Sequence, residues 1–91
     1  MVNILFEKVR YKSGQEKTLT LIKNKTEITW KILFKFINDN TGVSMDSIKL
    51  IHNNKYYKYD ESSVFHWENF MNKTDDFVIF RVKYYNNIEK N

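Results

Sequence analysis

The sequence predicts an α+β fold in which one helix crosses one face of a mixed sheet. Three observations support this prediction. Two runs that alternate apolar and polar residues precede a single stretch with helical periodicity. Two shorter strand-like runs come after that stretch, and a turn of helix and a last, strongly apolar run complete the pattern. The expected order is therefore β-β-α-β-β-(short helix)-β, which is an α+β roll.

The first element is predicted to be an antiparallel hairpin. In residues 2–7 alternation puts Val2, Ile4 and Phe6 on one face and Asn3, Leu5 and Glu7 on the other, and residues 18–21 alternate again. Between them, residues 10–16 are mostly polar and include Gly14, which is free to take a positive φ. Two alternating runs joined by such a loop favour a hairpin with one buried face.

The main helix is predicted from four large apolar residues at positions i, i+3, i+4 and i+7, namely Trp30, Leu33, Phe34 and Ile37. Thr29 is suited to cap the start of this helix, and Gly42 is suited to the left-handed position at its end. Ile32 and Phe36 form a second pair with i, i+4 spacing, away from the main apolar stripe.

The second half of the chain predicts three strands and one helical turn. Residues 47–52 are predicted to form a strand, a tight turn is expected at residues 53–54, and residues 55–59 return. Within residues 64–70, the spacing of Val64, Trp67 and Phe70 predicts one helical turn packed on the sheet. Residues 77–82 are apolar at nearly every position, as expected for a central strand.

Length and composition limit what the protein does. The chain of 91 residues is expected to form one domain over residues 1–84 and a flexible C-terminal tail over 85–91. Cysteine is absent and only two glycines occur, which excludes thiolate metal sites, disulfides and glycine-rich phosphate loops. No apolar run is long enough to span a membrane and no secretion signal is evident, so we expect a cytoplasmic or nuclear protein.

The most specific stretch of the sequence is residues 40–55, which read Asn-Thr-Gly-Val-Ser-Met-Asp-Ser-Ile-Lys-Leu-Ile-His-Asn-Asn-Lys. It resembles the ubiquitin-like family in its helix-ending glycine, its loop with an aspartate, its basic–Leu–Ile–aromatic strand, its two-residue turn and its lysine. The resemblance covers about residues 2–83 and implies the β-grasp fold. The chain as given lacks a C-terminal Gly-Gly, so a non-conjugating member of the family is expected.

The resemblance also implies a partner-binding site on the exposed face of the sheet. In position, Ile51 and Phe80 correspond to the apolar patch that ubiquitin uses most often, Lys49 and Lys55 flank that patch, and His52 lies beside it. Periodicity alone requires one residue of Leu50–Ile51 and one of Ile79–Phe80 to point outward, because a one-sided sheet buries alternate residues. We therefore expect noncovalent binding of another protein, for which the resemblance suggests a ubiquitin-pathway component.

Three other surfaces remain open at this stage. Ile32 and Phe36 predict a secondary partner-binding site on the back of the helix, or else Phe36 turns into the core. The Lys/Tyr-rich segments 55–59 and 83–85 are compatible with nucleic-acid binding, and the net charge of +4 permits it. In the third alternative, the first hairpin binds an acidic partner with its basic side chains, which are Lys8, Arg10, Lys12 and Lys17.

The sequence offers little for catalysis. The only histidines are His52 and His66, and neither has an acidic or histidine neighbour at the spacing of a metal ligand. A chain of this size is also expected to lack a cleft of the usual ~300–1,000 Å³. We therefore expect no enzyme activity, no metal and no cofactor.

Overall fold

The structure is a computed structural model and describes residues 1–85. Its strands and helix are β1 (Val2–Arg10), β2 (Glu16–Lys23), α1 (Trp30–Thr41), β3 (Ile48–His52), β4 (Lys55–Lys58) and β5 (Phe77–Tyr84). Short 3-10 turns occupy Lys25–Glu27, Met45–Ser47 and Trp67–Asn69. The prediction of an α+β fold with one mixed sheet and one main helix is confirmed.

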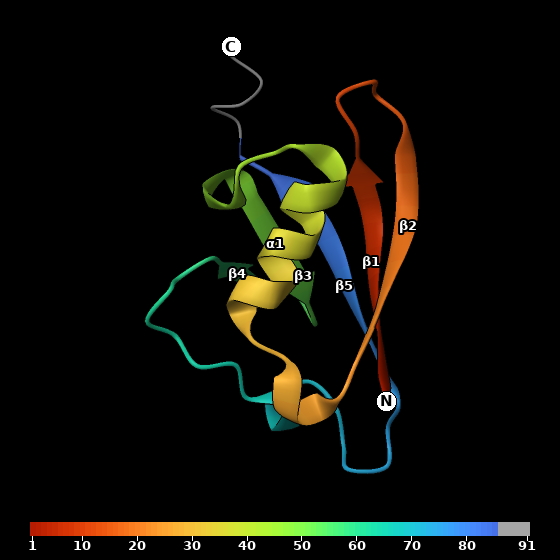
Figure 1. Cartoon of the computed structure of the whole chain (residues 1–91), viewed down its shortest axis with the longest axis vertical. Coiled ribbons are helices and arrows are strands. Elements are labelled where there is room, and N and C mark those ends of the chain that lie inside the picture. Colours follow the sequence, from red (N-terminus) through yellow and green to blue (C-terminus); the bar gives the residue numbers. More distant parts are fainter. Residues whose placement is uncertain (86–91) are drawn as a thin grey trace.

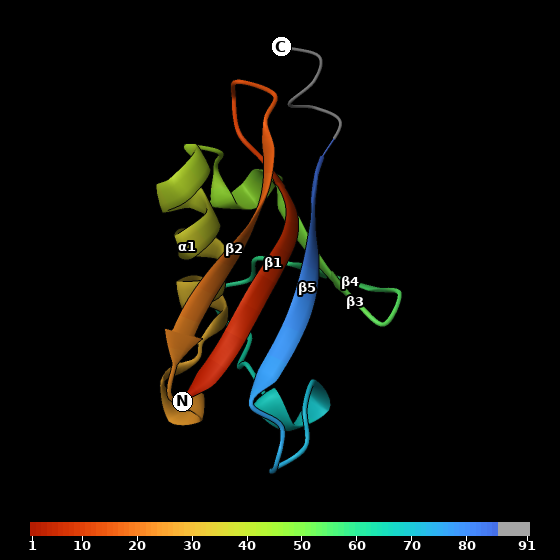
Figure 2. The ribbon, with the colours of Figure 1, turned by 90° about the vertical axis from the view of Figure 1, so that its right-hand side faces the viewer.

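The five strands form a single sheet in the order β2-β1-β5-β3-β4 (Figure 1). The last strand of the chain, β5, lies in the middle, where it pairs in parallel with β1 and antiparallel with β3. The helix α1 lies against one face of this sheet (Figure 2). We call the opposite face of the sheet the outer face.

The bounds of α1 follow from local chemistry, as predicted. The hydroxyl of Thr29 accepts the amide N–H of Ile32 at 3.1 Å, which satisfies one of the free donors of the first turn. At the other end, Gly42 has φ 78° and donates its N–H to the carbonyl of Asn38 at 2.7 Å. The four apolar residues of the predicted stripe are all buried.

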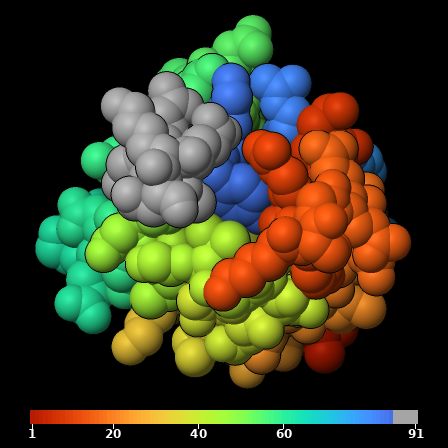
Figure 3. Space-filling view, turned by 90° about the horizontal axis from the view of Figure 1, so that it is seen from above, coloured from red at the N-terminus to blue at the C-terminus, as the bar shows by residue number. Residues whose placement is uncertain are grey.

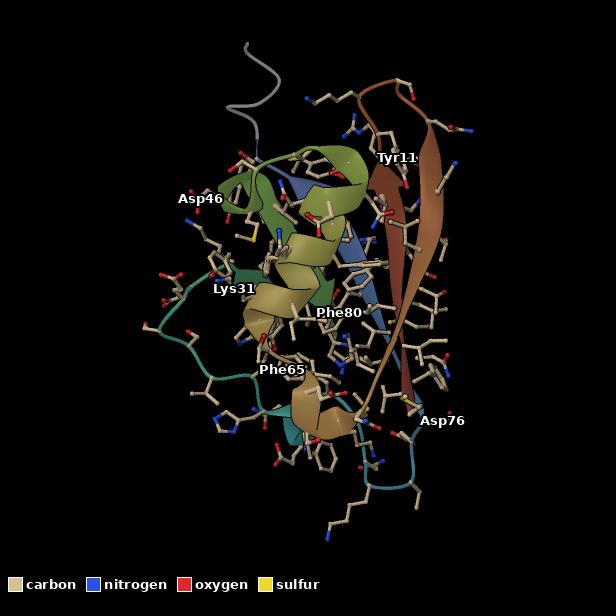
Figure 4. The ribbon with its side chains drawn as sticks, in the orientation of Figure 1. Tyr11, Lys31, Asp46, Phe65, Asp76 and Phe80 are labelled. Carbon is tan, nitrogen blue, oxygen red and sulfur yellow. The ribbon has the colours of Figure 1, made fainter. Side chains whose placement is uncertain are left out.

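The core lies between α1 and the sheet and is rich in aromatic rings. Phe80 lies between the helix and the sheet and has no exposed surface (Figure 4). Its ring stacks on that of Phe6 with centroids 6.1 Å apart. At the start of the helix, the rings of Trp30 and Phe65 are nearly perpendicular, with centroids 4.8 Å apart. Val64 does not pack as its spacing predicts, since it is 69% exposed and the adjacent Phe65 is buried instead.

A bulge in β1 lets the first hairpin keep its apolar residues inside. The register with β2 shifts between Phe6 and Val9, and Lys8 between them has φ 60°. Without the extra residue, Val9 would point to the outer face, but in the structure it is fully buried. Beyond the bulge, the β1–β2 loop reaches across the C-terminal end of α1 (Figure 3). There the side chain of Lys12 packs over Gly42, and its Cε would lie 3.4 Å from the Cβ of any larger residue at that position.

Tyr85, the first residue of the expected tail, contacts the domain. Tyr85 donates its backbone N–H to the carbonyl of Ser47 at 3.0 Å, and its ring lies 4.6 Å below the ammonium of Lys49. The rest of the expected tail, residues 86–91, lies outside the described residues. Within residues 1–85, no helix is long and apolar enough to cross a membrane.

Candidate partner-binding face

Cross-strand register shows which side chains of β3 reach the outer face. Leu50 is opposite Val82, and both are buried under α1. Ile51 is opposite Arg81 and therefore points to the other side, because residues directly opposite in a sheet share a face. The prediction that one residue of the Leu50–Ile51 pair turns outward is confirmed, and Ile51 is that residue.

Phe80 does not lie on the outer face, which corrects the expectation from the resemblance. It has no exposed surface, and its ring lies 5.4 Å from that of Phe70 in the core. The neighbouring Ile79 takes the outward position and is 38% exposed. The physical reason is the two-residue period of a strand, since an error of one position exchanges the buried and exposed sets.

His52 and Lys55 also lie away from Ile51. They are opposite each other at the end of the β3–β4 hairpin, on the side of the sheet that faces the core. The His52 ring packs against Phe70 at 5.2 Å, and its Nδ1 lies 3.3 Å from the carbonyl oxygen of Ile79. His52 therefore closes the edge of the core, and of the two predicted flanking lysines only Lys49 is on the outer face.

The outer face is best described as four rows of side chains that run across the strands. Each row follows from the register of neighbouring strands, and the rows change from basic at one end to apolar at the other. The first row is Lys58, Lys49 and Lys83, the second Tyr56, Ile51, Arg81 and Glu7, the third Ile79, Leu5 and Thr20, and the fourth Phe77, Asn3 and Ile22.

Exposed apolar surface is concentrated on this face. Among residues 1–85, six large hydrophobic side chains are exposed, and four of them belong to these rows: Ile22, Tyr56, Phe77 and Ile79. Ile51 contributes little surface of its own because it is 5% exposed between Tyr56 and Arg81. We therefore define the apolar patch as Ile22, Phe77 and Ile79.

A hollow of about 610 Å³ opens beside the apolar patch. The hollow exists because β3 ends at His52, so that the start of β5, from Phe77 to Ile79, has no paired strand on that side. The β3–β4 hairpin projects from the sheet beside this step (Figure 2). Asn53 and Glu7 are among the polar residues that line the hollow. The expectation that the chain has no hollow of this size is wrong.

Three titratable residues, Glu7, His52 and Asp75, are among those that line the hollow. Within the described part of the chain, no cluster of three or more histidine, aspartate or glutamate side chains is suitably placed for a metal ion. His66, the second histidine, is exposed at the start of the Trp67–Asn69 turn. Carbonyl, carboxylate and apolar groups around the hollow are suited to contact a partner.

The secondary site on the back of α1 is not an exposed apolar pair. The Phe36 ring lies 5.5 Å from that of Phe6 and packs against the core. Ile32 is half-buried. The alternative in which Phe36 turns into the core is the one observed.

The aromatic residues of the Lys/Tyr-rich strand are divided between the two faces. Tyr57 stacks on Trp30 at 5.2 Å, and Tyr59 lies 5.6 Å from Phe34, so both pack on the core side. Only Tyr56 of this segment points to the outer face, where it is 54% exposed.

Two of the cations on the first hairpin contact the domain itself. The ammonium of Lys17 lies 5.3 Å from the centre of the Tyr11 ring, and the Arg10 guanidinium lies 5.9 Å from that of Tyr84. This hairpin therefore presents a less continuous basic surface than its sequence suggests.

Sequence reasoning missed Ile22 and Phe77 as members of the face. Both belong to strands with apolar residues on two sides, so that alternation within one strand does not distinguish the core side from the outer side. The register distinguishes the two sides. Asn3 of β1 is opposite Phe77 of β5 and also opposite Ile22 of β2, so all three side chains share one face.

Comparison with known proteins adds no family to this description. No protein-family model matches the chain, and no curated protein is significantly similar to it in sequence. The interpretation of the outer face therefore rests on its geometry and on the resemblance of residues 40–55.

Proposed function

We propose that this protein is a ubiquitin-like β-grasp domain that acts as a noncovalent protein-interaction module. The strand order β2-β1-β5-β3-β4, with a parallel central pair and one helix on one face, supports the fold. So does the stretch of residues 40–55, in which Gly42 ends the helix and Asn53 and Asn54 form the turn.

The apolar patch carries the functional proposal. Phe77 and Ile22 are each more than half exposed, and Ile79 is 38% exposed, on a sheet face that α1 does not cover. Grouped apolar side chains of this kind cost free energy in water, which is recovered when a partner covers them, at about 25 cal/mol per Å². Binding, and not catalysis, is the role that we assign to this face.

The patch is small, so the affinity depends on a few side chains. Phe77 and Ile79 are placed to form the buried centre of an interface, since they border the hollow where a partner side chain can enter. The lysines of the first row, Lys49, Lys58 and Lys83, form a charged rim that accelerates association.

Capture of partners by the wild-type protein and by two variants tests this proposal. In the first variant, Phe77→Thr and Ile79→Thr remove the centre of the patch but place threonine, which favours strands, at both positions of β5. The control is Val64→Thr, which removes an exposed aliphatic side chain outside the patch. Circular dichroism verifies that both variants fold before a lysate of the source organism is applied.

We expect a partner to be captured by the wild type and by the Val64→Thr control, and to be lost with the double variant. Retention at about 500 mM salt is also expected, because burial of apolar surface is not screened by salt. Equal capture by all three proteins would contradict the proposal. Capture that disappears with nuclease would favour the nucleic-acid alternative.

A further inference from the structure

Three lysines stand side by side on the outer face. Lys49 is the register partner of Lys58 on β4 and also of Lys83 on β5. Neighbouring strands are about 4.8 Å apart, so the backbone positions of the three residues span about 10 Å across the strands. Within residues 1–85, the one ion pair joins Lys35 and Asp39 on α1, so none of the carboxylates in this part of the chain pairs with the row.

Such a row opposes folding, because like charges directly opposite each other in a sheet are destabilising. Tyrosine rings support it in place of acids. The Lys49 ammonium lies 5.1 Å from the Tyr56 ring and 4.6 Å from that of Tyr85, and Lys58 lies 5.1 Å from Tyr85. These contacts hold the ammonium groups of Lys49 and Lys58 over the face and leave their charge available to an anion.

We propose that the lysine row, defined as Lys58, Lys49 and Lys83, binds an acidic segment of the protein partner. This inference rests on the proposed function, because it assigns the chemistry of the segment that also covers the apolar patch. Along β5, Lys83 and Ile79 are four residues apart, which corresponds to about 13 Å in a strand. An extended partner segment therefore carries its acidic residues about four positions from an apolar anchor.

The contacts of the row favour a peptide over a nucleic acid. The Tyr56 and Tyr85 rings at the row carry lysine ammonium groups. Phe77, another exposed ring of this face, lies in the fourth row, at the opposite end from the lysines, so a ring free for base stacking is not adjacent to the phosphate-binding cations. Beyond the row, the face continues with Ile79 and Phe77, which cannot bind phosphates. Glu7, which is opposite Arg81, adds a negative charge that would repel a nucleic-acid backbone.

The test uses the full chain and a fluorescent synthetic peptide in which a run of glutamates precedes a leucine by about four residues. A matched peptide has glutamine in place of each glutamate. Binding is measured by fluorescence anisotropy, and the contact surface is mapped by NMR of the ¹⁵N-labelled protein. We expect the glutamate peptide to bind and to shift the amide signals of β3, β4 and the end of β5.

The decisive variant is Lys49→Glu, and its matched control is Lys31→Glu on α1 (Figure 4). Both variants change the net charge equally, so they separate a local site from general attraction. We expect Lys49→Glu to weaken binding about tenfold, because it reverses a charge that faces the acidic segment, and Lys31→Glu to change it less than about twofold. Lys58→Glu on the exposed edge strand serves if Lys49→Glu disturbs the sheet.

Three results would overturn the inference: equal weakening by the Lys49 and Lys31 variants, equal binding of the glutamine peptide, or tighter binding of an oligothymidylate at the same residues. The Phe77→Thr/Ile79→Thr variant distinguishes this inference from the proposed function. Binding that needs the apolar patch but not Lys49 would leave the proposed function standing and reject the acidic segment. Binding that needs Lys49 but not the patch would support the acidic segment and reject the apolar patch as the binding site.

Discussion

The hydroxyl of Tyr84 makes two hydrogen bonds to the backbone of Arg10. It donates to the carbonyl oxygen at 2.8 Å and accepts the amide N–H at 3.2 Å. The parallel ladder between β1 and β5 extends only to the pair of Glu7 and Arg81, because the bulge at Lys8 separates the strands beyond it. A side chain therefore replaces the missing backbone pairing at the end of the central strand pair.

Replacing Tyr84 by phenylalanine should weaken the fold. The change removes both hydrogen bonds and leaves two polar groups of Arg10 without these partners, so we expect the free energy of unfolding to fall by about 1–2 kcal/mol. Urea-induced unfolding followed by circular dichroism measures the effect. Tyr56→Phe is the matched control, since the Tyr56 side chain is exposed and should change the stability by less than about 0.5 kcal/mol. Equal losses for both variants would show that the bonds to Arg10 contribute nothing.

Stability should also fall at alkaline pH in a way that depends on Tyr84. Burial of its side chain raises the pKa of Tyr84 above the ordinary value of 10.0. A tyrosine with a raised pKa stabilises the fold fully below pH 10.0, and this contribution is lost as the pH rises through the folded-state pKa. Unfolding curves at intervals from about pH 8 to 11.5 should decline more steeply for the wild type than for Tyr84→Phe. Parallel declines would mean that ionisation of Tyr84 is not coupled to folding.

Phe80 and Ile79 are adjacent, but their replacement by alanine should affect stability and partner binding differently. Phe80→Ala leaves a cavity between α1 and the sheet and should cost about 3–5 kcal/mol. Ile79→Ala removes a side chain from the outer face, where we expect a loss below about 1 kcal/mol but weaker partner capture. Thermal unfolding and the capture assay measure the two effects. If Ile79→Ala proves the more destabilising of the two, the assignment of faces is wrong.

The lysine row should reduce stability, because its like charges repel each other. Lys83→Glu replaces a like-charge pair with Lys49 by an opposite-charge pair, so we expect a gain of about 0.2–1 kcal/mol and a higher melting temperature. The same change should weaken binding of the glutamate peptide. Lys31→Glu should leave the melting temperature nearly unchanged. A lower melting temperature for Lys83→Glu would show that repulsion within the row is negligible.

The β3–β4 turn can be strengthened at one position. Asn53 and Asn54 both have positive φ, 50° and 65°, which is the geometry of a two-residue type I′ turn. Asn54→Gly should stabilise the domain by about 0.5 kcal/mol, because glycine adopts this conformation without strain. Asn54→Ala should destabilise it by about 1 kcal/mol, since alanine disfavours positive φ. Denaturant unfolding of the pair gives the sign directly.

Local patterns predicted the helix and the turn well. Thr29 and Gly42 mark the ends of α1 through hydrogen bonds to residues three or four positions away, so the relevant chemistry lies within the same short segment. The asparagine pair of the β3–β4 turn is local in the same sense. For the helix, one stripe of large apolar residues was enough to identify the buried side.

The face of each strand was harder to predict. β5 has apolar residues on both sides, so its sequence alone fits either orientation, and Phe80 was placed outside although it lies in the core. His52 was placed beside Ile51, yet an odd separation of one residue puts it on the opposite side. Such errors are resolved only when a neighbouring strand fixes the register.

By itself, the sequence determined the kind of elements, their approximate bounds and the residues that end them, because those depend on contacts within a few positions. The tertiary structure decided which apolar residues meet solvent and which charges become neighbours. Lys49, Lys58 and Lys83 are separated along the chain, and only the pairing of β3 with both β4 and β5 brings them into one row. Cross-strand pairing joins residues distant in sequence, and for that physical reason no local pattern reveals such a site.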